Sequence, residues 1–308
     1  MKKTIGLLIS VCCSVVSFAQ TQLDSVQYLD VIELSDIKLK QNAEGFKVTV
    51  LNDSVLNKNT SNFTDLLRFN SNIYFKENGY GMVSSPSFRG TNASQTAVIW
   101  NGININSQLN GQTDFNTINT NNINQVVIRN GGGSVQYGSG AIGGSVHLDN
   151  RLSFTQHLKN DVKLNYGSFE CKNISLVTDY GQDKFAFNLG VNYVDSDNDY
   201  KYLDSDKINE NGAFNNLSLN ANLGYFISDK DVLKLYHQTF FGEREFSGTT
   251  ATPSKSKYKD ENSRSMLEWV STHQNYKSNF KVAYLKEYFE FYQNKNSEFF
   301  TFGQVNTF

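Results

Sequence analysis

Residues 185–193 read Phe-Ala-Phe-Asn-Leu-Gly-Val-Asn-Tyr, with large apolar side chains at every second position. Because successive side chains of a β-strand point to opposite faces, this stretch predicts a strand with one apolar face and one polar face. Residues 217–227 repeat the pattern, and residues 162–166 show a shorter version of it. Strands of about ten residues with such alternation are typical of β-barrels that cross an outer membrane.

A soluble β-sandwich is the alternative, because it shows similar alternation, although its strands are usually shorter. Residues 181–183 and 228–230 form tight connections, whereas residues 195–212 and 243–262 are long and polar. Such alternation is expected of periplasmic turns and extracellular loops, and only the short connection at 167–170 departs from it. We therefore predict that residues 151–308 form about seven or eight antiparallel strands of a transmembrane β-barrel.

The N-terminus has the features of an export signal. Lys2 and Lys3 precede an apolar stretch at 5–16, and residues 17–19 read Ser-Phe-Ala, which fits cleavage after Ala19. We expect a signal peptide at 1–19 and a linker at 20–40. The mature chain then keeps one cysteine, Cys171, and no internal disulfide. Lys and Arg total 28 against 30 Asp and Glu, a balance that provides no basic surface for nucleic acid.

Residues 41–150 differ in composition, with short apolar runs between turns rich in Gly and Asn. Glycine-rich turns indicate backbone angles that only glycine tolerates. We expect a small α+β globule in this region. Its expected elements are strands at 46–51, 97–100 and 123–129, a short helix at 62–68, and glycine-rich turns at 130–133 and 137–144.

Five segments of this globule follow one another over almost ninety residues, after the signal and before the barrel-like strands. They are Asp65-Leu66-Leu67 with Ile73, Ser87-Phe88-Arg89-Gly90, residues 98–106, residues 123–129 and residues 136–146. The ordered series resembles the plug domain of TonB-dependent outer-membrane receptors. The resemblance implies an α+β plug followed by an antiparallel transmembrane β-barrel. Because the plugged barrels of this family have about 22 strands, it also implies that the barrel is completed beyond residue 308.

Residues 89–94 and the Asn101-Gly102 turn followed by Asn104 look most like the cobalamin receptor branch of this family. Two features differ from the family pattern: Asn101 replaces the usual Asp, and residues 130–133 replace the common Arg-Gly-Pro. Siderophore, haem and metal-chelate receptors share most of the matching positions, so they stay open as alternatives to a cobalamin receptor.

The resemblance implies energy-coupled uptake of a scarce nutrient through the outer membrane. A small nutrient ligand is expected on the outer face, membrane lipid around the strands, and TonB with its inner-membrane motor as the partner of a monomer. A non-transporting surface binder or adhesin is the alternative. Catalysis is not expected, because the four histidines are scattered and no Gly-x-Ser-x-Gly elbow occurs. A hydrolase with a convergent Ser–His pair is the rival from another class.

The segment expected to contact TonB lies between the signal and the plug. In the family an extended segment at this point pairs edge to edge with a strand of TonB, and such pairing draws its affinity from backbone hydrogen bonds. The β-branched pair Val31-Ile32 favours an extended form. A first strand of the plug is the alternative. The expected contact residues are Asp30, Val31, Ile32, Glu33 and Leu34.

Two plug segments, 78–82 and 106–112, are candidates for substrate contact, because in the family the outer loops of the plug bind the ligand. Their amide side chains offer both donors and acceptors, which suits an amide-rich or hydroxylated ligand. Ordinary turn chemistry also explains Asn-Gly pairs. The candidate residues are Asn78, Tyr80, Met82, Asn106, Gln108, Asn110 and Gln112.

A further set is expected to hold the plug together. Arg89 and Arg129 are expected to be buried plug cations that pair with barrel carboxylates, as the resemblance implies. The other expected structural residues of the plug are Gly90, Tyr137, Gly138, Gly143 and Gly144.

Five aspartates near the outer end of a predicted strand are candidates for a Ca²⁺ site. Asp195, Asp197 and Asp199 alternate and so share one side of the strand, with Asp204 and Asp206 close by. Carboxylate oxygens suit a hard cation such as Ca²⁺. A solvated acidic loop is the alternative, and no other cofactor is expected.

Overall fold

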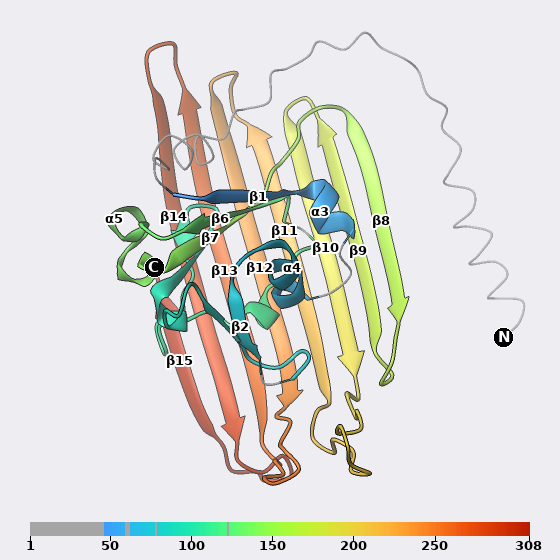
Figure 1. The fold of residues 1–308 in the computed structure, drawn as a ribbon. Coiled ribbons are helices and arrows are strands. Elements are labelled where there is room, and N and C mark those ends of the chain that lie inside the picture. The colour runs from blue at the N-terminus through green and yellow to red at the C-terminus, as the bar shows by residue number, and fades with distance from the viewer. Residues whose placement is uncertain (1–45, 59–61, 78, 122) are drawn as a thin grey trace, which may run out of the picture. The chain divides into compact units, whose positions relative to one another are not determined.

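The computed structural model describes residues 46–58, 62–77, 79–121 and 123–308. A small mixed domain, here called the plug, precedes a set of long strands, here called the long sheet (Figure 1). Within these ranges no helix has the length and apolar character needed to cross a bilayer.

The described residues of the plug form a five-stranded sheet in the order β1-β6-β7-β4-β5 and a separate pair, β2-β3. β4 and β7 are parallel, while the other neighbours are antiparallel. The strands are β1 (Val48–Asn52), β2 (Tyr74–Glu77), β3 (Ser84–Ser87), β4 (Thr96–Trp100), β5 (Ile103–Asn104), β6 (Gln125–Asn130) and β7 (Gly144–Asp149). The helices are α3 (Asp53–Lys58), α4 (Phe63–Asn70) and α5 (Ser134–Tyr137), with 3₁₀ turns η1 (Ala93–Gln95), η2 (Phe115–Thr117) and η3 (Ser139–Ala141).

Helix α4 shows how the sequence builds the plug core. Asn62 caps its first turn, since the side-chain oxygen accepts a hydrogen bond from Asp65 N at 2.8 Å. Apolar residues three and four positions apart then lie on one face, where Leu66 and Leu67 are buried. Phe63 stacks on Phe115 with ring centroids 5.4 Å apart. The predicted helix at 62–68 is therefore confirmed, and its buried face forms part of the plug core.

His147 lies inside the plug on β7 and is 3% exposed. Its Nε2 is 2.9 Å from Ser145 Oγ, and its ring meets the Tyr137 ring edge-on with centroids 4.7 Å apart. Burial, helped by the charge of nearby Arg129, lowers the pKa of His147 to about 4. The folded plug therefore holds this imidazole neutral down to mildly acidic pH.

We expect the protein to lose stability as the pH falls from about 6.5 to about 4, because the unfolded histidine takes up a proton over this range and the folded one does not. At about 1.4 kcal/mol per pKa unit, the loss in free energy of unfolding is about 3 kcal/mol. The measurement is the unfolding midpoint at several pH values for the parent and for His147→Gln. The variant should show a weaker pH dependence than the parent, and identical profiles for the two proteins would contradict the prediction.

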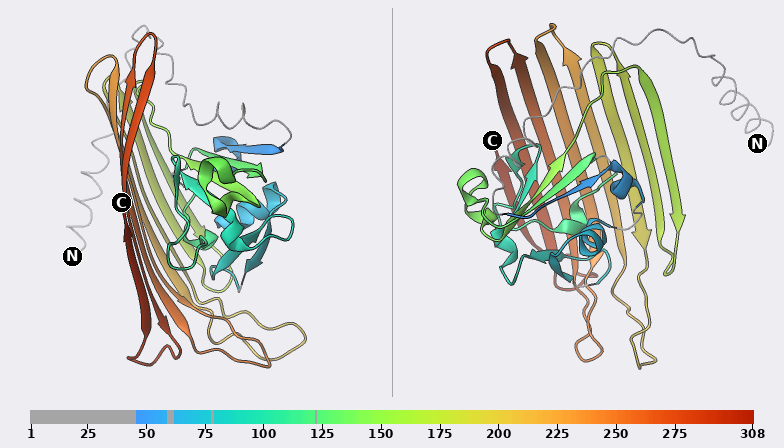
Figure 2. Two further views of the ribbon diagram at one scale, coloured as in Figure 1. Left: turned by 90° about the vertical axis from the view of Figure 1, so that its left-hand side faces the viewer. Right: turned by 45° about the horizontal axis from the view of Figure 1, so that its top comes forward.

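The long sheet has eight strands in the described chain, and each pairs antiparallel with its neighbours in sequence (Figures 1 and 2). This agrees with the predicted number. β13 and β14 reach 16 residues each, well beyond the 5–6 residues usual for globular sheets. The strands are β8 (His157–Tyr166), β9 (Lys172–Gln182), β10 (Phe185–Ser196), β11 (Phe214–Phe226), β12 (Asp231–Glu245), β13 (Lys257–Thr272), β14 (Lys277–Tyr292) and β15 (Thr301–Thr307).

The two faces of the long sheet carry the reverse of the pattern expected in a soluble protein. On β10, Asn188 and Asn192 are 5% and 8% exposed, whereas Leu189 and Val191 on the opposite face are 42% and 45% exposed. A row of exposed apolar side chains is unfavourable in water and favourable against lipid. The polar face is the one that the plug contacts. This distribution rules out the soluble sandwich and fits the wall of a membrane barrel.

Short and long connections alternate along the long sheet as predicted, but the structure shortens one loop. β12 runs to Glu245 and β13 begins at Lys257, so the loop expected at 243–262 is reduced to 246–256. The predicted loop was too long because charged residues at the strand ends are typical of a solvated loop. In the structure they pair across the ladder, with Lys257 Nζ 2.7 Å from Glu243 Oε1.

Candidate functional site

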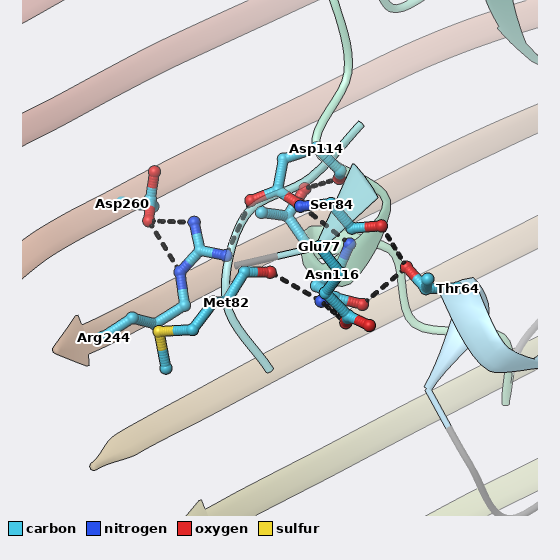
Figure 3. Close-up of polar contacts among 9 residues, drawn as sticks. Thr64, Glu77, Met82, Ser84, Asp114, Asn116, Arg244 and Asp260 are labelled. Atoms are coloured by element: carbon cyan, nitrogen blue, oxygen red, sulfur yellow. Dashed lines mark hydrogen bonds and ion pairs between the residues drawn. The ribbon is translucent and has the colours of Figure 1, made fainter. Parts of the chain in front are cut away.

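Arg244 joins the plug to the long sheet (Figure 3). It lies on β12 with its side chain 2% exposed. Its Nη1 donates to Asp114 Oδ2 of the plug at 2.6 Å, and its Nη2 donates to Asp260 Oδ2 on β13 at 2.6 Å. The Arg244 Nε donates to the same Asp260 oxygen at 3.2 Å. One buried cation thus has one carboxylate partner in the plug and a second in the sheet; we call these three residues the plug anchor.

Asp114 is held in place by the backbone of the plug. It caps η2, and its Oδ1 accepts hydrogen bonds from Asn116 N at 3.0 Å and Ser84 N at 2.9 Å. These two bonds fix the carboxylate so that the other oxygen, Oδ2, points at Arg244 (Figure 3). The position of the anchor therefore depends on the local fold of the plug.

Asn116 connects the plug anchor to the loop at 79–82. Its Nδ2 donates to the carbonyl oxygen of Met82 and to Glu77 Oε1, both at 2.6 Å. Its Oδ1 accepts from Thr64 Oγ1 of α4 at 2.7 Å (Figure 3). The buried side-chain amide of Asn116, two residues after Asp114, thus links the loop to α4. A displacement of the loop would strain bonds next to the anchor.

The loop at 79–82 meets the connection between β10 and β11 and the start of β11. Asn198 Nδ2 donates to the carbonyl oxygen of Tyr80 at 3.4 Å, and the Tyr80 ring is 5.9 Å from the Phe214 ring. Gly81 has φ of +74°, and a Cβ there would come within 2.7 Å of Phe214, so the loop needs glycine at this point. Tyr80 is 41% exposed, whereas Met82 is fully buried and offers its side chain to no ligand in this structure.

The second candidate loop, 106–112, has both structural and exposed members. The Asn106 side chain bonds within the plug, accepting from Val98 N at 2.8 Å and donating to the carbonyl oxygen of Thr96 at 2.9 Å. Gln108 and Asn110 are exposed and Gln112 is half-buried. The structure therefore leaves Gln108 and Asn110 as the more open candidates of this loop.

Further polar contacts hold the plug against the long sheet. Ser107 Oγ donates to Glu287 Oε2 on β14 at 2.7 Å. Lys281 Nζ, also on β14, donates to the carbonyl oxygen of Asn101 at 2.6 Å. Asn121 Nδ2 donates to Ser175 Oγ on β9 at 2.8 Å. The contact therefore extends across much of the sheet.

The expectation for the two plug arginines holds only in part. Arg129 is 4% exposed, and its guanidinium lies 5.1 Å from the centre of the Phe46 ring. Arg89 is exposed in this structure, in a turn at φ +49°, so its burial against a barrel carboxylate stays a prediction. The ion pair that joins plug and sheet has the opposite polarity, because the plug supplies the carboxylate of Asp114 and the sheet supplies Arg244.

The glycine-rich turns occupy tight positions in the plug. A Cβ on Gly144 would lie 2.7 Å from the carbonyl oxygen of Arg129, and Gly143 is similarly crowded by Thr91. Gly90 and Gly138 have φ of +84° and +86°, which favour glycine even though the space beside them is open. Tyr137 packs on His147 as described above.

The structure does not bring the five candidate aspartates together. Asp206 pairs instead with Lys201 at 2.7 Å on the surface. Among the residues that the structure describes, no group of three His, Cys, Asp or Glu side chains could hold a metal ion. Calcium binding by Asp195, Asp197, Asp199, Asp204 and Asp206 stays a prediction, which calorimetric titration with Ca²⁺ would test.

Four predicted features lie outside the described residues. They are the signal peptide at 1–19, the linker at 20–40, the TonB-contact segment at 30–34 and the candidate ligand residue Asn78.

Residues 40–145 match the family model of the TonB-dependent receptor plug domain. This range covers strands β1 to β6, the start of β7, the helices of the plug and Asp114 of the plug anchor, and the long sheet follows it. Residues 40–145 are therefore a plug domain of the TonB-dependent receptor family. The resemblance to this family that the sequence predicted is confirmed, and so is the predicted outer-membrane location.

Two sequence relatives of this receptor are vitamin B12 transporters named BtuB. The protein from Vibrio vulnificus (strain YJ016) is 31% identical over 117 residues, which cover 36% of this chain and 19% of the relative. The protein from Vibrio cholerae serotype O1 (strain M66-2) is 27% identical over 163 residues, which cover 52% of this chain and 26% of the relative. The matches thus span 19–26% of the length of these relatives.

Solved structures share the fold of this receptor. The copper transporter OprC superposes with a TM-score of 0.69 at 16% identity, over 84% of this chain and 41% of that protein. The siderophore receptor PirA from Acinetobacter baumannii superposes with a TM-score of 0.66 at 16% identity, over 91% of this chain and 46% of that protein. Both comparisons support the plug and the barrel wall as the fold.

Proposed function

We propose that this receptor takes up cobalamin across the outer membrane as a monomer, with energy supplied through TonB. The observation that carries the proposal is the match to vitamin B12 transporters, which at 163 residues is longer than the plug match at 40–145. The exposed amides of the 106–112 loop support it, because cobalamin carries amide side chains that can pair with such groups.

The geometry supports a mechanism in which the plug moves relative to the wall. Ligand at the outer loops contacts the 79–82 segment, and Asn116 passes a displacement of that segment to Asp114. TonB, paired with residues 30–34, then pulls on the plug and separates Asp114 from Arg244. Because Arg244 keeps its bonds to Asp260, it stays paired within the long sheet after this separation.

Growth under nutrient limitation tests the proposed substrate. A strain lacking the receptor gene should need more cyanocobalamin than the parent when cobalamin limits growth, and the restored gene should reverse the defect. Growth on haem or on ferric chelates as the iron source should stay unchanged. A defect confined to one of those iron sources would replace cobalamin with that ligand. Unchanged growth in every medium would contradict uptake as the function.

A further inference from the structure

Arg264 is a buried cation of the long sheet that differs from its neighbours. It lies on β13 and is 5% exposed, on the same face as Met266, which packs into the plug core. Lys234 and Lys281, in the same sheet, are held by Glu268 at 3.7 Å and 3.2 Å. Arg264 has no ion-pair partner among the described residues, and its Nε donates to none of them. A buried charge without a partner is unfavourable, so this position needs an explanation.

Glu287 is the carboxylate that this arginine can reach. It lies on β14 and is 9% exposed. Leu285 is the residue paired with Arg264 in the ladder, so Glu287 is the diagonal neighbour of Arg264 on the same face. Long side chains in this relation can touch, and the charge of Glu287 already acts on the guanidinium. Rotation of the two side chains is therefore enough to pair them.

Glu287 is held by the plug instead. Ser107 Oγ donates to Glu287 Oε2 at 2.7 Å. Ser107 belongs to the loop at 106–112, and the same Oγ accepts a hydrogen bond from Leu109 N at 3.1 Å. The fold of the loop thus positions this hydroxyl, beside the exposed residues Gln108 and Asn110. A displacement of the loop withdraws the hydroxyl from Glu287.

We propose that Ser107 and Arg264 are alternative partners of Glu287; we call these three residues the Glu287 switch. With the loop in place, Glu287 accepts the hydrogen bond from Ser107, and Arg264 stays unpaired. When the loop leaves the wall, the Glu287 carboxylate turns to Arg264, and the new ion pair stabilises the released state. The proposal rests on the movement of the plug in the proposed function, and not on the identity of the nutrient.

The Glu287 switch and the plug anchor act in opposite directions. The bond between Arg244 and Asp114 favours the docked plug, whereas Arg264 favours the released loop. An arginine that only supported the docked loop would weaken docking when it is removed. Removal of Arg264 should instead strengthen docking, because the released state loses its ion pair. The sign of the change therefore separates the proposal from a structural role.

The experiment measures the fraction of receptor in which the loop has left the wall. Thr113, at the base of the loop, is 5% exposed, and its Oγ1 lies 3.4 Å from Asn106 Oδ1. Thr113→Cys, introduced together with Cys171→Ser, therefore provides a thiol that the docked loop covers. The rate at which N-ethylmaleimide modifies this thiol, in detergent micelles and without added nutrient, follows the released fraction when the loop recloses faster than the reagent reacts.

Three variants in this background test the switch. Ser107→Ala should raise the rate of modification about tenfold, because the docked loop loses a hydrogen bond to a charged group. Arg264→Met should lower the rate about tenfold, because the released state loses a buried ion pair. Lys286→Met is the matched control, since it removes a lysine on the opposite face of β14 that pairs with Glu261, and the rate should be unchanged.

A coupled variant shows whether Arg264 acts through Glu287. In the Glu287→Gln background, Arg264→Met should no longer lower the rate, because the ion pair is already lost. Arg264→Gln, which keeps a polar side chain, should act as Arg264→Met does. A higher or unchanged rate in both Arg264 variants would overturn the proposal. A tenfold decrease that persists in the Glu287→Gln background would overturn it as well.

The outcome is separable from that of the proposed function. If the rates change as described while the strain lacking the receptor grows normally with limiting cobalamin, the Glu287 switch stands and the cobalamin proposal falls. If that strain needs more cobalamin and the Arg264 variants modify at the parent rate, the uptake proposal stands and the switch falls.

Discussion

Arg244→Met is expected to lower the free energy of unfolding by about 3–5 kcal/mol, because removing one partner of a buried ion pair leaves the other uncompensated. In this receptor two carboxylates lose their cation, Asp114 in the plug and Asp260 in the sheet, each 2.6 Å from the guanidinium. The measurement is the midpoint of denaturant-induced unfolding of the protein in detergent micelles.

Three further variants isolate the cause of that loss. Lys286→Met removes a half-exposed ion pair with Glu261 in the same sheet and should cost only about 0–1 kcal/mol. The triple variant Arg244→Met, Asp114→Asn, Asp260→Asn removes all three charges and should recover much of the stability. Asp114→Asn alone should cost less than Arg244→Met, because Arg244 keeps Asp260. An Arg244→Met protein as stable as Lys286→Met would show that the anchor contributes nothing.

Ile32→Pro is expected to abolish uptake while leaving binding and folding intact. Proline removes a backbone N–H and restricts φ, so it interrupts the edge-to-edge pairing proposed for residues 30–34 with TonB. The measurement is accumulation of labelled cyanocobalamin by cells, together with binding to isolated outer membranes. Ile32→Thr, which keeps both the N–H and the β-branched side chain, is the matched control and should transport normally.

Deletion of residues 30–36 separates the uptake receptor from a surface adhesin. A TonB-dependent transporter should lose uptake and keep binding, whereas an adhesin should lose neither function. Normal accumulation of cyanocobalamin by the Ile32→Pro receptor would show that the segment at 30–34 does not couple transport to TonB.

Much of the fold follows from local patterns in the chain. The alternation at 185–193 predicted both the strand and its apolar face, because one side chain in two meets lipid and the next meets the plug. The helix at 62–68 follows from a capping asparagine and three apolar residues on one face. Each of these features is determined by residues that are close together in the sequence, so the local pattern is enough to predict it.

The plug anchor could not be predicted in the same way. Asp114 and Arg244 are 130 residues apart, and only the packed structure brings them to 2.6 Å. Arg244 lies near the end of a strand among other charged residues, where the local pattern indicates a solvated loop. The alternation along residues 231–245 places Arg244 on the face that is buried in the structure. It therefore predicts that the side chain faces inward, but it does not identify the partner.

A reversible cross-link between plug and wall tests most directly whether the plug lies on the polar face of the strands and must move during uptake. Asn121 and Ser175 touch at 2.8 Å, so Asn121→Cys and Ser175→Cys, introduced together with Cys171→Ser, place two thiols across the boundary. We predict that oxidation joins them, that the oxidised receptor binds its nutrient without importing it, and that reduction restores import. A pair that does not cross-link, or a cross-linked receptor that imports at the parent rate, would contradict this structure and its proposed mechanism.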